Sequence, residues 1–255
     1  MKKVFLYLFI FFLIILGIYF YRDFSQKSSQ TPQPSETVSK KSPYIISQEK
    51  LPEETSQEKP SKQEPEIPQE YDLKVPFVPQ APFGVWDDLH NNACEEASVL
   101  LVHYFKQNKS LSKEQADKEI KAMVDSQIKK YGKHKDLTAQ ETADLAKEFY
   151  GYKNIKVIYD FTWDDVKKEI AQGNPVIVPA AGRLLKNPNF RRPGPIYHMF
   201  VIRGYTKDEI ITNDVGTRNG ERYRYSYTIL NNALHDWTGN PDTIQTGKRA
   251  MLVID

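Results

Sequence analysis

A polar, proline-rich stretch from Ser25 to Glu70 is the strongest constraint on how this chain can fold. The stretch consists largely of Ser, Gln, Glu, Lys and Pro, contains no glycine, and has Tyr44 as its only aromatic residue. Such a composition cannot bury enough apolar surface to offset the entropy lost on folding. We therefore interpret residues 25–70 as a disordered linker, which its prolines stiffen toward an extended conformation.

An apolar run precedes this linker. Val4–Phe20 comprises 17 residues without a charge, and two lysines stand before it. As a helix this run would be about 26 Å long, which nearly spans a bilayer. We interpret residues 1–24 as a transmembrane signal anchor, because residues 19–22 offer no small-residue cleavage site; the alternative is a cleaved signal peptide. The positive-inside rule then predicts a single-pass cell-membrane protein with residues 71–255 outside the cytoplasm.

Residues 71–255 are long enough for one domain with a substantial core. Helix starts come first in this stretch, each with a capping residue followed three positions later by Glu, Gln or Asp: Asn92, Ser112, Thr138 and Thr162. Runs typical of β-strands come later, at 156–159, 176–180, 199–205, 209–215, 222–227 and 250–254. This order predicts an α+β fold in which N-terminal helices pack on an antiparallel sheet.

Charge and motifs exclude several classes of function. Lys and Arg number 35 against 33 Asp and Glu, so the net charge of +2 provides no strong field for nucleic acid. The chain has neither a GxGxxG nor a GxxxxGK[ST] motif, which disfavours nucleotide binding. One cysteine and five scattered histidines do not fit a disulfide scaffold or a zinc ribbon. We therefore expect no cofactor, nucleotide or nucleic-acid partner.

Cys94 is the first candidate for chemistry. With Asn92 as the cap, it would be the second residue of its helix, where the dipole and unpaired N–H groups favour the thiolate. Glu95 and Glu96 act in the opposite direction. A buried, structural cysteine is the alternative. We favour a functional thiol because an unused, exposed one is a liability outside the cytoplasm.

A nucleophilic cysteine needs an imidazole within hydrogen-bonding reach. His103 stands nine residues farther along the same helix, about 13 Å away, and His90 precedes the cap. His134 lies between two lysines and is expected to be solvated, and His235 is expected to pack in a short helix. His198 opens an apolar strand after a Pro-Gly-Pro loop, where a side chain can reach into a cleft. His198 is therefore the preferred partner.

The next strand supplies an acid. A strand ending at Tyr205 and another beginning near Glu209 must form a tight hairpin, in which paired residue numbers sum to about 412 to 415. This register places His198 opposite Asp214 or its neighbours. A carboxylate there can accept the imidazole N–H and fix its tautomer, whereas the alternative is that residues 213–216 form only an Asx turn.

Four segments together resemble the papain-like peptidases related to the bacteriocin-processing, double-glycine-leader cysteine peptidases of family thirty-nine: Val75–Gln80, Ala93–Ser98, Tyr197–Tyr205 and Asn213–Gly216. The resemblance implies a papain-like fold over most of residues 71–255. It also implies Cys94 as the nucleophile, His198 as the general base and acid, and Asp214 as the orienting residue. Gln80 would be the side-chain donor of the oxyanion hole.

The position of Gln80 leaves alternatives for that donor. It precedes Cys94 by 14 residues, which is more than is usual in the family. Asn91 or Asn92 could donate instead, whereas an ionised Asp88 could not.

The expected function is hydrolysis of peptide or amide bonds in a peptide or protein substrate, through a thioester and without a cofactor. The alternatives are a catalytically silent module that binds peptide or cell-wall material, and a cell-wall amidase or transpeptidase. A zinc site formed by Cys94, His90, His198 and Asp214 ranks last, because no short ligand-pair spacing supports it.

The loop 182–196, which precedes His198, has four cations: Arg183, Lys186, Arg191 and Arg192. With three prolines, it is expected to lack regular structure. We expect either a wall of the substrate groove that favours acidic substrates or a solvated surface loop.

Overall fold

The computed structural model describes residues 67–255. The predicted anchor, residues 1–24, and nearly all of the predicted linker lie outside the described residues. No helix within residues 67–255 is both long and apolar enough to cross a membrane. Contacts with the domain begin before residue 71, because Ile67 packs against the core and the Pro68 carbonyl accepts a hydrogen bond of 2.9 Å from the Tyr205 hydroxyl.

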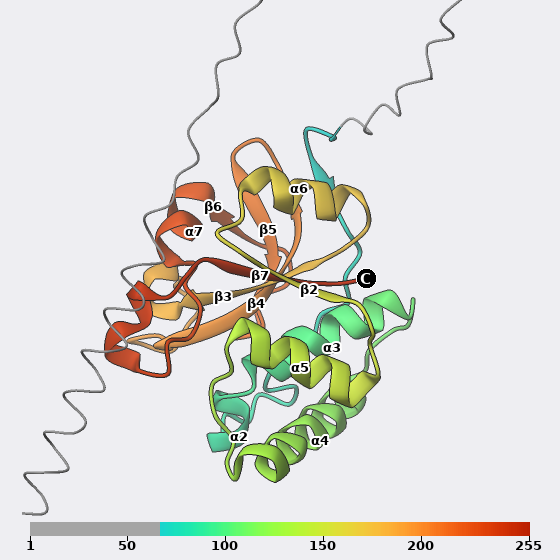
Figure 1. The fold of residues 1–255 in the computed structure, drawn as a ribbon, viewed down its shortest axis with the longest axis vertical. Helices are drawn as coiled ribbons and strands as arrows, with labels where there is room; N and C mark the ends of the chain where they lie inside the picture. The colour runs from blue at the N-terminus through green and yellow to red at the C-terminus, as the bar shows by residue number, and fades with distance from the viewer. Residues whose placement is uncertain (1–66) are drawn as a thin grey trace, which may run out of the picture. The chain divides into compact units, whose positions relative to one another are not determined.

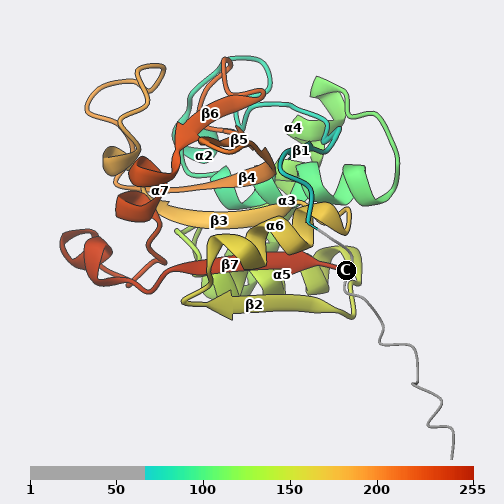
Figure 2. The same ribbon diagram turned by 90° about the horizontal axis from the view of Figure 1, so that it is seen from above.

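One antiparallel sheet forms the centre of the domain. Its strands are β1 (Tyr71–Asp72), β2 (Ile155–Tyr159), β3 (Val176–Ala181), β4 (Tyr197–Tyr205), β5 (Glu209–Asn213), β6 (Tyr223–Ser226) and β7 (Ala250–Ile254). The spatial order is β2-β7-β3-β4-β5-β6, and β1 pairs with the end of β4. Figure 2 shows β2, β7, β3 and β4 side by side in this order. The last strand along the chain therefore lies inside the sheet, between β2 and β3.

Helices cover both faces of this sheet (Figure 1). They are α2 (Asp88–Asn91), α3 (Cys94–Lys106), α4 (Lys113–Tyr131), α5 (Ala139–Tyr150), α6 (Trp163–Ala171) and α7 (Tyr227–Ala233), with 3-10 turns at Gly182–Leu185 and Pro241–Thr246. α3 packs on β4 and α5 on β2 and β7, with α4 outside them, whereas α6 covers the other face. The predicted α+β fold, with helices on an antiparallel sheet, is confirmed.

Three of the four predicted helix starts are confirmed. Ser112, Thr138 and Thr162 each form a capping box with the residue three positions later. These signals are local, because the side chain and backbone that pair lie within one turn. They were therefore readable from the sequence.

The predicted cap of α3 is wrong. Asn92 follows α2 and its side-chain amide donates to the Asp88 carbonyl at 2.9 Å, whereas Ala93 precedes α3 and provides no side-chain cap. Glu95 points into the protein instead of back to the cap. Cys94 is consequently the first residue of α3 and not the second.

The predicted hairpin between β4 and β5 has the expected register. Val201 pairs with Asn213 and Tyr205 with Ile210, with a bulge at Arg203. All nine residues of β4 are buried, so this strand holds its first residues rigidly at the edge of the core. The sheet thus brings the start of β4 to the end of β5.

Candidate active site

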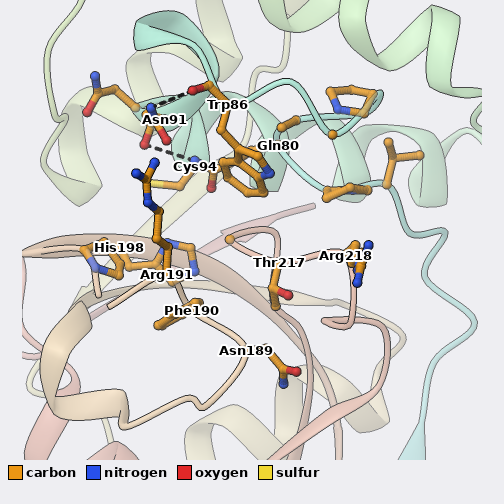
Figure 3. A pocket seen from close by; sticks show the side chains of 18 of the residues that line it. Gln80, Trp86, Asn91, Cys94, Asn189, Phe190, Arg191, His198, Thr217 and Arg218 are labelled. Carbon is orange, nitrogen blue, oxygen red and sulfur yellow. Dashed lines mark hydrogen bonds between the residues drawn. The ribbon is translucent and has the colours of Figure 1, made fainter. Parts of the chain in front are cut away.

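An open cleft lies where five parts of the chain meet: the segment 77–86, the start of α3, the start of β4, and the two loops that carry residues 189–196 and 216–219. Cys94 and His198 both line it (Figure 3). All five histidines lie within the described residues, and His198 is the only one among the cleft's lining residues. The cleft therefore brings together the sequence-predicted thiol and imidazole.

The thiol of Cys94 points to a neighbouring acid. Its Sγ donates to Glu95 Oε2 at 3.0 Å, and the cysteine is only 4% exposed. Burial, reinforced by the Glu95 carboxylate, raises the pKa of the Cys94 thiol. Burial and the acid together therefore keep the proton on the resting thiol.

Glu95 is fully buried and is fixed by two donors. Its Oε1 accepts the Leu137 N–H at 2.7 Å, while Oε2 accepts the thiol. Burial raises the pKa of Glu95, and the nearby carboxylates of Glu96 and Asp136 raise it further. Burying a carboxyl group against a thiol is costly, so this pair needs the Leu137 N–H to remain in place.

Glu96 extends this acidic cluster away from the cleft. It accepts from Gln127, and His134 Nε2 lies 3.5 Å from Glu96 Oε1. The side chain of His134 is 13% exposed, so the prediction of a solvated histidine is wrong. Its two flanking lysines indicated solvent, but the fold places the ring against Glu96.

His198 is held by Asp214. The two side chains meet at 2.7 Å between Nε2 and Oδ1, and both are buried. A carboxylate can only accept, so Nε2 carries a proton and Nδ1 is the ring nitrogen left free to exchange one. Phe190 packs edge-on against the ring, with 5.3 Å between centroids. A Cβ on Gly216 would lie 2.8 Å from His198 Cε1, so only glycine leaves room for this ring orientation.

Asp214 is saturated with hydrogen bonds. Its Oδ1 also accepts the Gly216 N–H at 3.0 Å, and Oδ2 accepts from Asn187 at 3.0 Å and from the Tyr225 hydroxyl at 2.5 Å. Burial alone would raise the pKa of Asp214, but His198 and these donors hold it below its usual value. The side chain is therefore a carboxylate at neutral pH. No local signal in the sequence indicates Asn187 or Tyr225, because both reach Asp214 only through the fold.

Gln80 is buried and lines the cleft near Cys94. Its side-chain amide donates to the carbonyls of His90 at 2.7 Å and Asn91 at 3.1 Å, and its Oε1 has no partner within residues 67–255. Asn91 and Asn92 also line the cleft, and each donates one bond to a backbone carbonyl. All three sequence-predicted amide donors thus lie around Cys94, and each asparagine has a second amide hydrogen.

The other histidines have structural partners. His90 lies between Asp87, at 2.7 Å, and Asp117, at 3.0 Å. The His103 ring stacks on another aromatic side chain. His235 follows α7 instead of lying in a helix, so that prediction is wrong, and its Nδ1 lies 2.9 Å from a backbone carbonyl. No group of three or more His, Cys, Asp or Glu residues between positions 67 and 255 is arranged to hold a metal ion.

Two solved structures are similar to this chain. A Bacillus anthracis protein described as a C39-like peptidase has 13% identity and a TM-score of 0.49, over 74% of this chain and 98% of that one. Xylellain, a cysteine protease from Xylella fastidiosa, has 12% identity and a TM-score of 0.44, over 74% and 87% of the two chains. Comparison with curated proteins gives no match.

A family comparison gives the assignment. The model of the Peptidase_C39 like family matches residues 72–242, which is most of the chain and includes every side chain that lines the cleft. The resemblance seen in the four sequence segments is thereby confirmed. The chain belongs to the Peptidase_C39-like family.

Proposed function

We propose that this protein is a cysteine peptidase that cleaves peptide or amide bonds, with Cys94 as nucleophile, His198 as general base and acid, and Asp214 as the residue that orients the imidazole. One observation carries this proposal. His198 Nε2 is bound at 2.7 Å to a charged Asp214, which leaves a basic Nδ1 in the cleft that Cys94 lines. A thiol and an oriented imidazole on one cleft suit acyl transfer.

The reaction begins when the Cys94 thiol exchanges its hydrogen bond to Glu95 for one to His198. The Cys94 side chain turns so that its S–H meets Nδ1, which accepts the proton. The thiolate attacks the substrate carbonyl carbon, and the C–N bond breaks as the imidazolium gives its proton to the leaving amine. Water then attacks the thioester, giving a proton to His198, and the acid is released with the thiol restored.

The developing oxyanion requires donors near Sγ. Cys94 is the first residue of α3, so its own N–H has no acceptor within the helix and is suited to this role. We propose Gln80 as the second donor, since it is buried beneath the cleft beside α3. Its bond of 3.1 Å to the Asn91 carbonyl is the longer of the two and would be exchanged for the oxyanion. Asn91 and Asn92 are the alternatives.

We also propose that residues 1–24 anchor the enzyme in the cell membrane and place the domain outside the cytoplasm. The 17 uncharged residues of Val4–Phe20 and the two lysines before them support this orientation.

Cleavage of a synthetic peptide pool tests the proposal. The full-length protein is incubated with random octapeptides, and mass spectrometry records new termini together with any acyl group on Cys94. We expect cleavage and an acyl-enzyme in the native protein, neither in Cys94→Ala, and a rate at least about 100-fold lower in His198→Ala. His235→Gln is the matched control, since His235 is not part of the cleft.

The alternatives give different results in the same assay. A silent binding module would retain peptides without any cleavage or acyl group. A transpeptidase would transfer the acyl group to an added amine in preference to water. In ¹⁸O-labelled water, hydrolysis places ¹⁸O in the new carboxylate, whereas transfer to the amine does not. Absence of an acyl group on Cys94, with cleavage unchanged in Cys94→Ala, would contradict the proposed nucleophile.

A further inference from the structure

One wall of the cleft has a concentration of arginines. Arg191 and Arg192 lie in the loop before β4, and Arg218 lies in the loop after β5. All three are exposed and line the cleft. Figure 3 shows the Arg191 side chain reaching from this wall toward Asn91 and Cys94, with Arg218 farther along the cleft beside Thr217.

Three arginines elsewhere on the domain are paired with acids. Arg203 and Arg222 both pair with Asp72, and Arg224 pairs with Glu209. None of the three cleft arginines has a carboxylate within ion-pair distance among residues 67–255. The exposed Arg222 and Arg224 thus have acidic partners, whereas the three cleft arginines and Arg183, which lies outside the cleft, have none within the described residues.

The charge balance of the cleft is positive. Lys113 is a fourth cation among its lining residues, and Asp136 is the one carboxylate among the described residues that line it. Burial, together with Glu96, raises the pKa of Asp136, although His134 opposes the shift. The low-dielectric walls of a cleft concentrate such a field, so the site attracts anions.

The opposite wall is apolar. Phe83, which is 54% exposed, lies there with the partly exposed Trp86, and Ile196 borders the cleft beside the arginines. Exposed aromatic and aliphatic groups next to unpaired guanidinium groups suit an extended peptide that has both apolar and acidic side chains.

We propose that the cleft selects peptides with aspartate or glutamate side chains, one bound by Arg191 near the reacting carbonyl and a second bound farther along by Arg218. This inference rests on the proposed peptidase function, because the bound peptides are substrates only if the protein cleaves them. Guanidinium groups bind carboxylates through two parallel N–H···O bonds, which a neutral Asn or Gln cannot form with the same strength.

Peptide retention by an inactive protein tests the selection without cleavage. Full-length Cys94→Ala is immobilised and exposed to random octapeptides with acetylated N-termini and amidated C-termini, so that side chains provide the only carboxylates. We expect retained peptides to be enriched in Asp and Glu over Asn and Gln by roughly threefold to thirtyfold at low salt. The enrichment should decrease as the ionic strength rises. A second pool with free C-termini shows whether a terminal carboxylate substitutes for a side chain.

A charge-matched pair of variants assigns the effect to the cleft. Arg191→Gln with Arg218→Gln should abolish the enrichment. Arg183→Gln with Lys186→Gln removes the same charge from exposed positions between β3 and β4 that do not line the cleft, and should preserve the enrichment. Equal retention of acidic and neutral peptides, no retention of any peptide, or equal loss in both double variants would overturn the inference.

The two proposals can fail separately. Cleavage by the native protein without acidic preference overturns the selection and leaves the peptidase function standing. Acidic enrichment without cleavage or an acyl-enzyme overturns the peptidase function, and the cleft is then a binding site for acidic peptides.

Discussion

The Cys94 thiol donates its hydrogen bond to Glu95 Oε2 at 3.0 Å, and within residues 67–255 it has no hydrogen bond to His198. The helix N-terminus favours a thiolate, but burial and a carboxylate one residue away raise the pKa of the thiol. The resting thiol therefore keeps its proton. Activation requires the Cys94 side chain to break its hydrogen bond to Glu95 and form one to the His198 imidazole.

Glu95→Gln should make Cys94 ionise at lower pH. The substitution removes an anion that penalises the thiolate, so the pKa of the Cys94 thiol decreases, while the new side-chain oxygen can still accept the Leu137 N–H. The iodoacetamide alkylation rate, measured between pH 5 and 10, should reach half its maximum at a lower pH than in the native protein. Glu96→Gln is the control, because Glu96 contacts Gln127 rather than the thiol and should give a smaller shift. Coincident profiles for Glu95→Gln and the native protein would show that the carboxylate does not control the thiol.

Tyr225→Phe should destabilise the domain in a pH-dependent way. Because the pKa of Asp214 is lowered in the folded protein, its carboxylate contributes stability above the unfolded pKa of about 3.9. That contribution is lost as the pH falls through the folded pKa. Removing the 2.5 Å bond from Tyr225 should cost about 1.5–3 kcal/mol of unfolding free energy at pH 7 and less near pH 3.

Urea denaturation at the two pH values measures this difference. Tyr223→Phe, on the same strand, is the control because the Tyr223 hydroxyl has no hydrogen-bond partner within the described part of the chain. Equal losses at pH 7 and pH 3 in Tyr225→Phe would mean that the hydroxyl does not stabilise the Asp214 carboxylate.

Gln80→Ala should lower kcat much more than Asn91→Ala or Asn92→Ala. Loss of one oxyanion donor costs roughly 10²- to 10³-fold in kcat. Steady-state kinetics on a peptide that the native protein cleaves measures this loss. Because Gln80 also donates to the His90 carbonyl, the melting temperature of each variant is measured to detect a general loss of structure. A larger effect in either asparagine variant would transfer the donor role to that residue.

Protease added to intact spheroplasts should degrade residues 71–255, and the protein should stay with the membrane fraction after a high-salt wash. Both results follow from an uncharged Val4–Phe20 segment behind two lysines. Deleting residues 4–20 should release the protein from the membrane fraction. If the domain is protected in intact spheroplasts and is degraded only after they are lysed, the proposed orientation is reversed.

The sequence predicted elements whose signals are local. The capping boxes at Ser112, Thr138 and Thr162 pair groups within one turn, and the β4–β5 register follows from a short hairpin. Those signals sufficed to place an acid beside His198. They failed at Asn92, because Glu95 bonds to the distant Leu137 N–H instead of closing a capping box.

Long-range partners could not be predicted from the sequence. Asn187 and Tyr225 lie on segments far apart along the chain and meet only at the Asp214 carboxylate. Arg218 joins Arg191 in the cleft because the loop after β5 folds beside the loop before β4. Neither residue type nor spacing indicates such meetings, since they depend on the order of strands in the sheet.

The place of β7 inside the sheet has a consequence for shortened forms of the protein. Without Ala250–Ile254, β2 has no neighbouring strand and β3 presents an unpaired edge. Exposed edges of this kind recruit other strands and promote aggregation. A chain that proteolysis has shortened within this strand is therefore expected to aggregate more readily than the native protein.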